Sequence, residues 1–359
     1  MIALAIFISN QNVHLVSNLQ IPVNCIKKYR FASMKNFILL ISLVSIVFSS
    51  CKTDFELNAP YKETMVIYGF LNANDNVQYI RISKGFLGEG NALIMAQQSD
   101  SINYADVLHV TIDEIANGNV TNTFLLERVD TIPKEAGLFA YPYQVYYRLS
   151  NHTLNPNALY RLNAENTETG TKASSVTRLV NDIVNITNPS IADVNFASSG
   201  QFSVKFSPVS NGRIYDLVIR FHYTEDSAGV ISYHYVDWNF PDQFTSGSSD
   251  IIFPYARQDF YAVLASAIPV NNAVTRTVGN AALGYPAVEF RMIAGTEDLY
   301  TYQQLNSASN TSLQDPPLFT TVENGLGLFT SRLIHLEFRN MTQKSLDSLQ
   351  EGQWTRDLF

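Results

Sequence analysis

"RIYDLVIRFHYTE", residues 213–225, and "VISYHYVDWNF", residues 230–240, decide the fold class of this 359-residue chain. Both stretches are rich in β-branched and aromatic residues, and both alternate in part between apolar and polar positions, which is typical of β-strands. The residues between them, 226–229, have the composition of a turn. The pattern therefore predicts a long β-hairpin.

Stretches of the same kind follow one another along most of the chain, separated by turn sequences such as "NAND" (72–75) and "NGN" (117–119). Residues 296–309 and, more weakly, 342–350 have a helical pattern. We therefore expect an all-β fold with two β-sandwich domains of the immunoglobulin or fibronectin-III kind, and one or two short helices in the C-terminal region. The predicted strands are residues 63–71, 77–83, 107–115, 120–129, 143–149, 158–166, 173–180, 202–209, 213–225, 230–240, 273–279, 287–295 and 332–338.

The chain divides into six predicted parts. They are an upstream extension (1–33), a signal peptide (34–50), a lipidated tether (51–62), an N-terminal sandwich (63–184), a C-terminal sandwich (190–340) and a C-terminal tail (341–359).

Residues 85–104 interrupt the N-terminal sandwich with a segment that is too long for an ordinary hairpin loop. This length makes the segment a candidate recognition loop, although such loops also cover edge strands.

The stretch "MKNFILLISLVSIVFSSC", residues 34–51, has the order of a secretory signal: a basic Lys35, an apolar run Phe37–Phe48, two small residues and then Cys51. The run is too short to cross about 30 Å of hydrocarbon as a helix, but it suits a cleavable signal. It resembles a bacterial lipoprotein signal peptide, with "FSSC" as the lipobox. That resemblance implies a lipidated Cys51 at the mature N-terminus; the alternative is a secreted protein in which Cys51 is incidental.

The residues before and after this signal carry two further expectations. Residues 1–33 do not have the order of a signal peptide, because no basic region precedes their apolar run. We therefore expect that the gene model begins too early and that Met34 is the true start. The residues after Cys51 are similar to the acidic export signals of Bacteroidota surface lipoproteins, which implies a surface-exposed, lipid-anchored protein of the outer membrane. The alternative is a solvated acidic linker. The export-like residues are Lys52, Thr53, Asp54, Phe55 and Glu56.

The amino-acid composition restricts the classes of partner and cofactor that we expect. Apolar residues make up 46% and charged residues 16% of the chain, which is typical of a folded protein. The chain from Cys51 onward holds 20 basic and 32 acidic side chains, a net charge of −12, so nucleic acid is not an expected partner. Cys25 and Cys51 are the cysteines of the sequence, and their position predicts neither a disulfide framework nor a cysteine metal site.

Four stretches resemble one known family. "VIYGFLN" (66–72) and "VQYIRIS" (77–83) are similar to the opening strand pair of the Bacteroidota lipoproteins grouped as domain of unknown function 4249, and "DLYTYQQLNSA" (298–308) with "NGLGLF" (324–329) is similar to the end of that family's domain. The resemblance implies an outer-membrane lipoprotein associated with TonB-dependent transporters. It brings no catalytic residues.

His222 and His234 are the candidate metal ligands. A hairpin turning near residues 226–229 can bring both onto one face, with Glu225 or Asp237 beside them, and two imidazoles with a carboxylate can bind zinc. The alternative is that these are polar residues on the outer face of a sheet. The common catalytic and phosphate-binding motifs are absent from the sequence, so we expect no catalytic residue, no cofactor and no enzyme activity.

Aromatic residues on the predicted strands suggest a stacking platform for a glycan. Tyr233, Tyr235 and Trp238 form one candidate set, although on a sandwich one alternating set of side chains must face the core. The second candidate set is Tyr141, Tyr143, Tyr146 and Tyr147. Glu89, Asp100 and Asp106 in or beside the 85–104 segment do not have the spacing of a known calcium site.

These expectations combine into one functional hypothesis. The protein is a non-enzymatic binding or accessory subunit, held at the membrane by its lipid anchor, that acts beside a TonB-dependent transporter in nutrient uptake and has a glycan or peptide ligand. The first alternative is a cell-surface adhesin or carbohydrate-binding module. The second is a hydrolase whose site the sequence does not signal.

Overall fold

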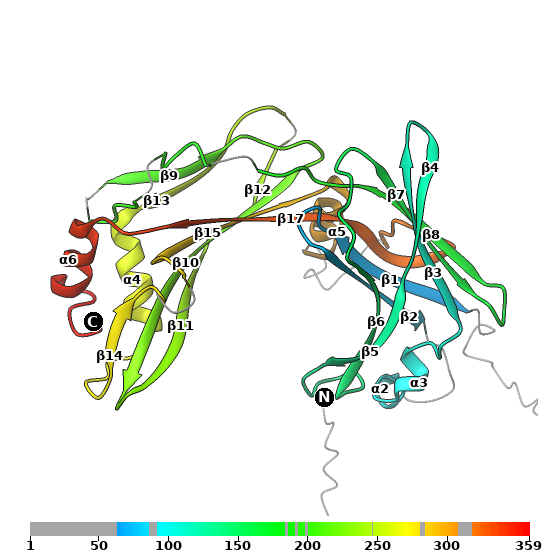
Figure 1. Ribbon diagram of the computed structural model, residues 1–359, viewed down its shortest axis with the longest axis horizontal. Helices are drawn as coiled ribbons and strands as arrows, with labels where there is room; N and C mark the ends of the chain where they lie inside the picture. The colour runs from blue at the N-terminus through cyan, green and yellow to red at the C-terminus, as the bar shows by residue number, and fades with distance from the viewer. Residues whose placement is uncertain are drawn as a thin grey trace, which may run out of the picture. The chain divides into compact units, whose positions relative to one another are not determined.

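A sheet of ten strands is the largest element of the fold (Figure 1). Eight of its strands follow the order β11-β10-β15-β17-β1-β2-β6-β5, while β12 and β14 each pair with β10. The strands are β1 (Thr64–Leu71), β2 (Val77–Gly85), β5 (Glu127–Pro133), β6 (Tyr143–Ser150), β10 (Ile214–Ser227), β11 (Val230–Asn239), β12 (Gln243–Phe244), β14 (Thr275–Val278), β15 (Val288–Gly295) and β17 (Gly325–Arg339). The all-β fold class is confirmed.

The computed structural model describes residues 63–85, 92–183, 186–190, 193–197, 200–245, 247–280, 284–307 and 318–359. They belong to one compact unit, Asn58–Phe359. The predicted extension, the signal peptide, Cys51 and the export-like residues Lys52–Glu56 lie outside the described residues, as does Glu89.

The long strand β17 connects the two halves of the sheet. Its first part, Gly325–Ser331, pairs in parallel with β1, and its second part, Arg332–Arg339, pairs antiparallel with β15. The hairpin predicted from residues 213–240 is confirmed as β10 and β11. Ala228 and Gly229 both have positive φ, as a two-residue hairpin turn of this kind requires.

Two smaller sheets complete the β-structure. One has the order β16-β8-β7-β3-β4 and the other pairs β9 with β13. The predicted strand 120–129 is in fact two strands, because the chain leaves the five-stranded sheet at the buried Leu126 and enters the ten-stranded sheet as β5. The strands are β3 (Leu108–Ala116), β4 (Asn119–Leu125), β7 (Leu159–Asn166), β8 (Lys172–Arg178), β9 (Gln201–Phe206), β13 (Ile251–Ala256) and β16 (Val322–Glu323).

The described helices are short. The two predicted helices are present as α5 (Glu297–Ser307) and α6 (Gln343–Glu351), and Thr342 caps α6 by accepting a hydrogen bond from the backbone N–H of Ser345. The segment predicted as a long loop instead contains α2 (Ala92–Ala96) and α3 (Ser99–Ile102). The helix α4 (Arg257–Ala267) was not predicted, because its N-cap Ala256 offers no side-chain cap to signal a start. None of the described helices is long and apolar enough to cross a membrane.

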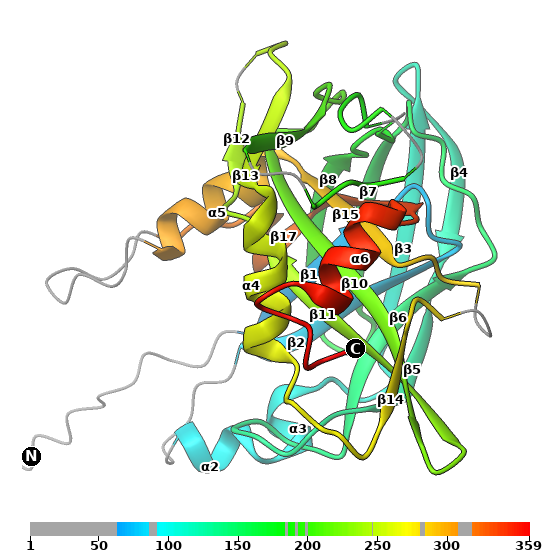
Figure 2. The same cartoon turned by 90° about the vertical axis from the view of Figure 1, so that its left-hand side faces the viewer.

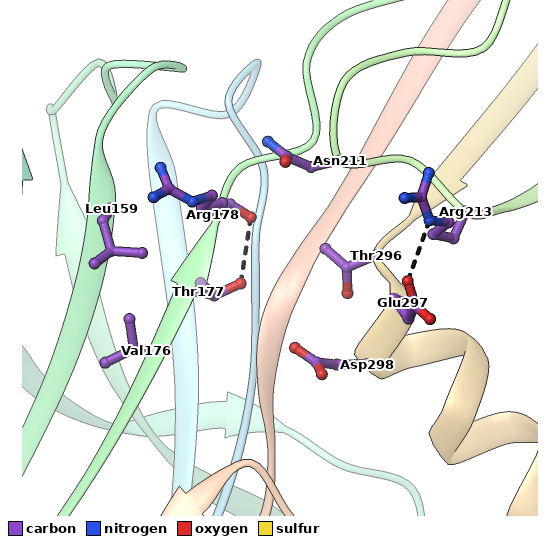
Figure 3. A pocket seen from close by; sticks show the side chains of 9 residues that line it. All are labelled: Leu159, Val176, Thr177, Arg178, Asn211, Arg213, Thr296, Glu297 and Asp298. Carbon is purple, nitrogen blue, oxygen red and sulfur yellow. Dashed lines mark hydrogen bonds and ion pairs between the residues drawn. The ribbon is translucent and has the colours of Figure 1, made fainter. Parts of the chain in front are cut away.

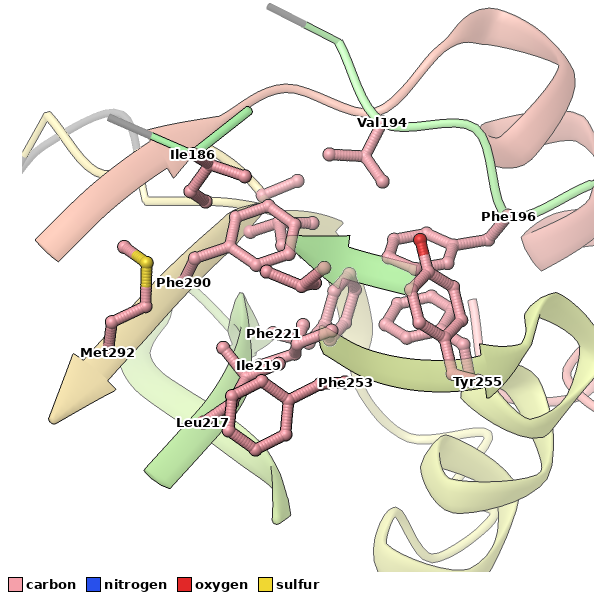
Figure 4. Packing of buried hydrophobic residues seen from close by; sticks show 14 of the residues in the cluster. Ile186, Val194, Phe196, Leu217, Ile219, Phe221, Phe253, Tyr255, Phe290 and Met292 are labelled. Carbon is pink, nitrogen blue, oxygen red and sulfur yellow. The ribbon is translucent and has the colours of Figure 1, made fainter. Parts of the chain in front are cut away.

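Both main hydrophobic clusters lie on the same face of the ten-stranded sheet. The first cluster is centred on residues of β1, β2, β3, β6 and β7 and includes Phe329, and the second is centred on residues of β10 and β15 and includes Leu333. Phe329 and Leu333 are four positions apart on β17, so their side chains point to the same face of the sheet. The first cluster fills the space between this sheet and the five-stranded sheet. The second packs β10 and β15 against the β9–β13 pair and the helices α4 and α6 (Figures 2 and 4).

This arrangement relates to the predicted parts in two ways. The range predicted for the N-terminal sandwich holds most of the first cluster, yet Val322 and Phe329 from the C-terminal half complete it. The predicted C-terminal tail contributes Leu349 and Leu358 to the second cluster.

On the opposite face of the ten-stranded sheet, α5 packs through Leu299 against Ile214 and Leu328. The side chains on the rest of that face form the candidate site.

Candidate functional site

Four aromatic rings lie together on the face of β10, β11, β15 and β17 that points away from the second cluster. We call Tyr233, Tyr235, Tyr285 and Phe338 the aromatic surface. The ring centroid of Tyr233 lies 6.2 Å from that of Tyr235 and 6.1 Å from that of Tyr285. The rings of Tyr285 and Phe338 are stacked, with their centroids 5.6 Å apart. Tyr235 is 50% exposed and Tyr285 is 38% exposed. The surface is thus open to a ligand.

His222 lies beneath the aromatic surface and holds it in place. It is buried, its Nδ1 lies 2.6 Å from the hydroxyl of Tyr233, and its ring stacks on Tyr285 at 5.2 Å. Its Nε2 lies 2.9 Å from a carboxylate oxygen of Glu289. Nδ1 and the Tyr233 hydroxyl form a hydrogen bond, while Nε2 faces the Glu289 carboxylate. This pair of contacts fixes the orientation of the Tyr233 ring.

Glu289 is a buried carboxylate in the middle of the sheet. Burial raises its pKa, but the hydrogen bond from His222 and the positive charges of Arg291 and Arg220 outweigh burial, so the pKa lies below its ordinary value. Arg291 contributes an ion pair of 2.7 Å between Nη1 and the carboxylate. Glu289 is therefore held ionised, and removing either partner leaves a buried charge with less compensation.

Arg220 supports the most exposed ring of the aromatic surface. Its guanidinium makes two parallel hydrogen bonds with the Asp237 carboxylate, at 2.6 and 2.8 Å. The same group lies 3.8 Å from the ring centroid of Tyr235. A planar guanidinium fixed by a carboxylate is a rigid partner for an aromatic face. Tyr235 therefore presents one face to Arg220 and leaves half of its surface to solvent.

This geometry suits recognition by stacking. Rings held by hydrogen bonds and ion pairs lose little conformational freedom when a ligand stacks on them. The carboxylate and guanidinium groups of Asp237, Arg220 and Arg291 are partly accessible and supply hydrogen-bonding partners beside the rings. A sugar ring, with an apolar face and hydroxyl groups at its edge, matches this combination.

The structure brings together two of the three predicted stacking residues. Tyr233 and Tyr235 are on the aromatic surface, but Trp238 is on the other face of β11, where its ring contacts Phe240 and Tyr255 at the edge of the second cluster. In the second candidate set, Tyr141 and Tyr143 are exposed whereas Tyr147 is buried in the first cluster. Tyr146 contacts Tyr79 on the outer face of β2 and β6.

The predicted pairing of His222 with His234 is wrong. His222 lies opposite Tyr235 in the β10–β11 ladder, and His234 lies opposite Tyr223, so the two imidazoles point to opposite faces. His234 instead lies 3.5 Å from Glu225. In the described ranges, no three His, Cys, Asp or Glu side chains are grouped as metal ligands.

Sequence reasoning missed five residues of the site: Arg220, Tyr285, Glu289, Arg291 and Phe338. A signal existed for Glu289, because "AVEFRMIAG" (287–295) places charged residues at alternating positions of a strand that is otherwise apolar. Tyr285 has no such signal, since it lies between β14 and β15 and reaches the site through the fold.

A hollow of about 290 Å³ lies between the end of β8, residues 211–213 and the start of α5 (Figure 3). Arg213 and Glu297 form an ion pair of 3.2 Å on one side, and Arg178 lies on the other. Burial and the neighbouring Glu297 raise the pKa of Asp298. The hollow presents mixed charges that compensate one another in part, without an aromatic ring, so the aromatic surface is the stronger candidate.

Fold and site together define an all-β protein whose largest sheet keeps both hydrophobic clusters on one face and an aromatic surface on the other. Residues 52–332 match the family model described as domain of unknown function (DUF4249), and the chain belongs to this family. No curated protein matches the chain.

Proposed function

We propose that this protein is a lipid-anchored, non-enzymatic binding protein of the cell surface, which captures a glycan on its aromatic surface and acts as an accessory subunit of a TonB-dependent transporter in the outer membrane. The single observation that carries the binding role is the aromatic surface itself. Rings that are exposed on a sheet face, yet fixed from below by a buried polar network, are pre-organised for stacking.

The polar network supports this reading through its energetic cost. Glu289 is almost fully buried and forms an ion pair with Arg291, and a buried ion pair is often no more stabilising than apolar residues of the same volume. A network that adds little net stability but orients exposed rings is what a recognition site requires. A surface that served only to complete the fold would gain more from apolar packing at these positions.

The anchor and the transporter belong to the same proposal on other grounds. The order of residues 34–51 supports lipidation at Cys51, and Asp54, Phe55 and Glu56 support the cell surface. A tether at the membrane raises the effective concentration of the protein beside an outer-membrane partner, so a small interface suffices for the association.

A binding experiment tests the recognition site. We expect the protein to bind at least one oligosaccharide of a glycan array, and the double variant Tyr235→Ala, Tyr285→Ala to lose about tenfold or more in affinity, because stacking on two rings is removed. Tyr68→Ala, Tyr79→Ala is the matched control, since these tyrosines have similar exposure on the same sheet face but lie outside the aromatic surface. Equal losses in both variants, or binding of peptides in place of glycans, would contradict the proposed site.

Two further measurements test the other parts. A mass spectrum of the mature N-terminus should show a diacylglyceryl Cys51 with residues 1–50 removed. Purification of the tagged protein from detergent-solubilised outer membrane should bring down a β-barrel transporter. If no barrel accompanies the protein while glycan binding persists, the adhesin or carbohydrate-binding module becomes the better description.

A further inference from the structure

We propose that a second surface of this protein contacts the lipid bilayer directly. Large apolar side chains are exposed on α2, on the segment before β6 and at the first residue of β6, and we call five of them the apolar tip: Ile94, Leu138, Phe139, Tyr141 and Tyr143. Their exposed fractions run from 42% for Phe139 to 61% for Tyr141. A concentration of exposed apolar side chains of this size is a mark of an interaction site.

The apolar tip is built on a fastened backbone. The N–H of Lys134 donates to the carbonyl of Pro142 at 2.7 Å, and its ammonium group donates to the carbonyl of Ala140 at 3.1 Å. The N–H of Ala140 donates in turn to the carbonyl of Ala96 at the end of α2, at 2.8 Å. Ala140 is buried while its larger neighbours are exposed. The small residue is therefore turned inward and the large apolar ones are held outward.

The apolar tip lies at the end of the sheet where β1, the first described strand, begins. β1 begins at Thr64, which pairs with Gly85 at the end of β2. Two residues earlier, Ser83 forms a bridge with Asn103, directly after α3, and Lys84 donates a hydrogen bond to the carbonyl of Asp100 in that helix. The helices α2 and α3 are therefore neighbours of the first described strand.

The length of the tether limits how far this end of the sheet can lie from the membrane. From Cys51 to Thr64 the chain advances by 13 residues, which span about 45 Å at full extension. Since the lipid anchor is part of the proposed function, the present inference rests on that proposal. An anchored Cys51 keeps α2 and α3 within reach of the bilayer surface.

The chemistry of the apolar tip favours a bilayer as the partner. Tyrosine side chains suit the membrane interface, where the ring meets the acyl chains and the hydroxyl stays hydrated. The ammonium group of Lys134, held by the carbonyl of Ala140, lies 5.4 Å from the ring centroid of Phe139 and places one positive charge beside the apolar tip. The net charge of −12 gives the protein no general attraction to anionic lipids, so apolar contact has to supply the affinity.

A fluorescence experiment tests this contact. The mature chain from residue 51 carrying Cys51→Ser contains no cysteine, so Phe139→Cys gives a single site for an environment-sensitive dye. Ile231→Cys, on the exposed hairpin of β10 and β11, is the matched control. With vesicles of phosphatidylethanolamine and a minority of phosphatidylglycerol, we expect a blue shift and quenching by brominated acyl chains at position 139 and neither effect at position 231.

Affinity gives the second measurement. Replacing Ile94, Leu138 and Tyr141 by serine should lower vesicle binding about tenfold or more, because even one large apolar side chain contributes that much when it leaves water. Val230→Ser, Ile231→Ser, Val270→Ser removes as many exposed apolar side chains elsewhere and should leave binding unchanged. Repeating the position-139 measurement with the lipidated protein in vesicles covers the case in which the unlipidated chain binds too weakly.

The outcomes separate this inference from the anchor. No spectral change at position 139 in the lipidated protein would overturn the bilayer contact, even with a lipidated Cys51 in the mass spectrum. A change at that position on adding a solubilised transporter, but not vesicles, would overturn it in favour of a protein interface. If the unlipidated chain bound vesicles through position 139, the bilayer contact would be supported even if the mass spectrum showed no lipid on Cys51.

Discussion

The hydroxyl of Tyr233 lies 2.6 Å from Nδ1 of His222, although the two residues are not opposite one another in the β10–β11 ladder. Tyr233 pairs with Thr224, and His222 pairs with Tyr235, so the contact is diagonal between neighbouring strands. His222 thereby links an accessible aromatic ring to the buried carboxylate of Glu289. Ligand contact on the surface and charge balance inside the sheet depend on one imidazole.

The first prediction concerns this imidazole. His222→Leu should lower the free energy of unfolding by about 3 kcal/mol, because Glu289 keeps its charge in a buried position while losing its hydrogen-bond donor. Adding Glu289→Gln to this variant should restore part of the loss. Urea unfolding of the two single variants and the double variant measures the coupling energy. Additive effects of the two substitutions would show that the contact carries no special interaction.

Local patterns predicted the strands of this site, but not its composition. The alternation in residues 213–240 predicted β10, β11 and their turn, since it depends on neighbours in the sequence. The pairing of His222 with Tyr235 depends on register, and a shift by one residue reverses every side chain. The parallel pairing of β1 with β17 joins Met65 to Gly325, and no local pattern encodes a contact over that distance.

The second prediction separates ligand binding from stability. Arg220→Lys keeps the positive charge near Asp237. It removes the bidentate hydrogen bond to the Asp237 carboxylate and the planar guanidinium that packs against the Tyr235 ring. Glycan affinity should fall about fivefold to tenfold, while thermal unfolding changes little. Arg213→Lys is the control, because its ion pair with Glu297 lies elsewhere and is more exposed. A large loss of stability without loss of affinity would show that Arg220 has a purely structural role.

The third prediction is a pH dependence caused by Asp216. Burial, together with the hydrogen bond and charge of Asp242, raises the pKa of Asp216 to about 7 from 3.8, although Arg332 opposes the shift. The folded protein therefore holds a proton that the unfolded chain releases, and stability falls as the pH rises from about 4 to about 7. Asp216→Asn removes this loss. Its Tm should exceed that of the wild type by about 2 °C or more near pH 8, and the difference should shrink toward pH 4.

A control keeps that measurement specific. Asp347→Asn is the control variant, because it changes an exposed carboxylate on α6 that accepts a hydrogen bond from Gln343 and lies away from Asp216. If Asp216→Asn gave a constant difference between about pH 4 and pH 8, Asp216 would not titrate in this range. Differential scanning calorimetry at both ends of the range decides between these results.

The last prediction concerns the junction between the two halves of the ten-stranded sheet. Gly327 pairs with Ile67 and has a φ of +114°. The two strands approach so closely here that a Cβ atom on residue 327 would lie 2.0 Å from the carbonyl oxygen of Ile67. Gly327→Ala therefore requires β1 and β17 to separate, and it should lower the free energy of unfolding by about 3 kcal/mol or more. Gly137→Ala is the control, because open space surrounds its Cβ position. Since β17 carries Phe338 beyond this junction, urea unfolding and glycan binding should both be impaired in Gly327→Ala, and unchanged stability would mean that the parallel pairing does not hold the halves together.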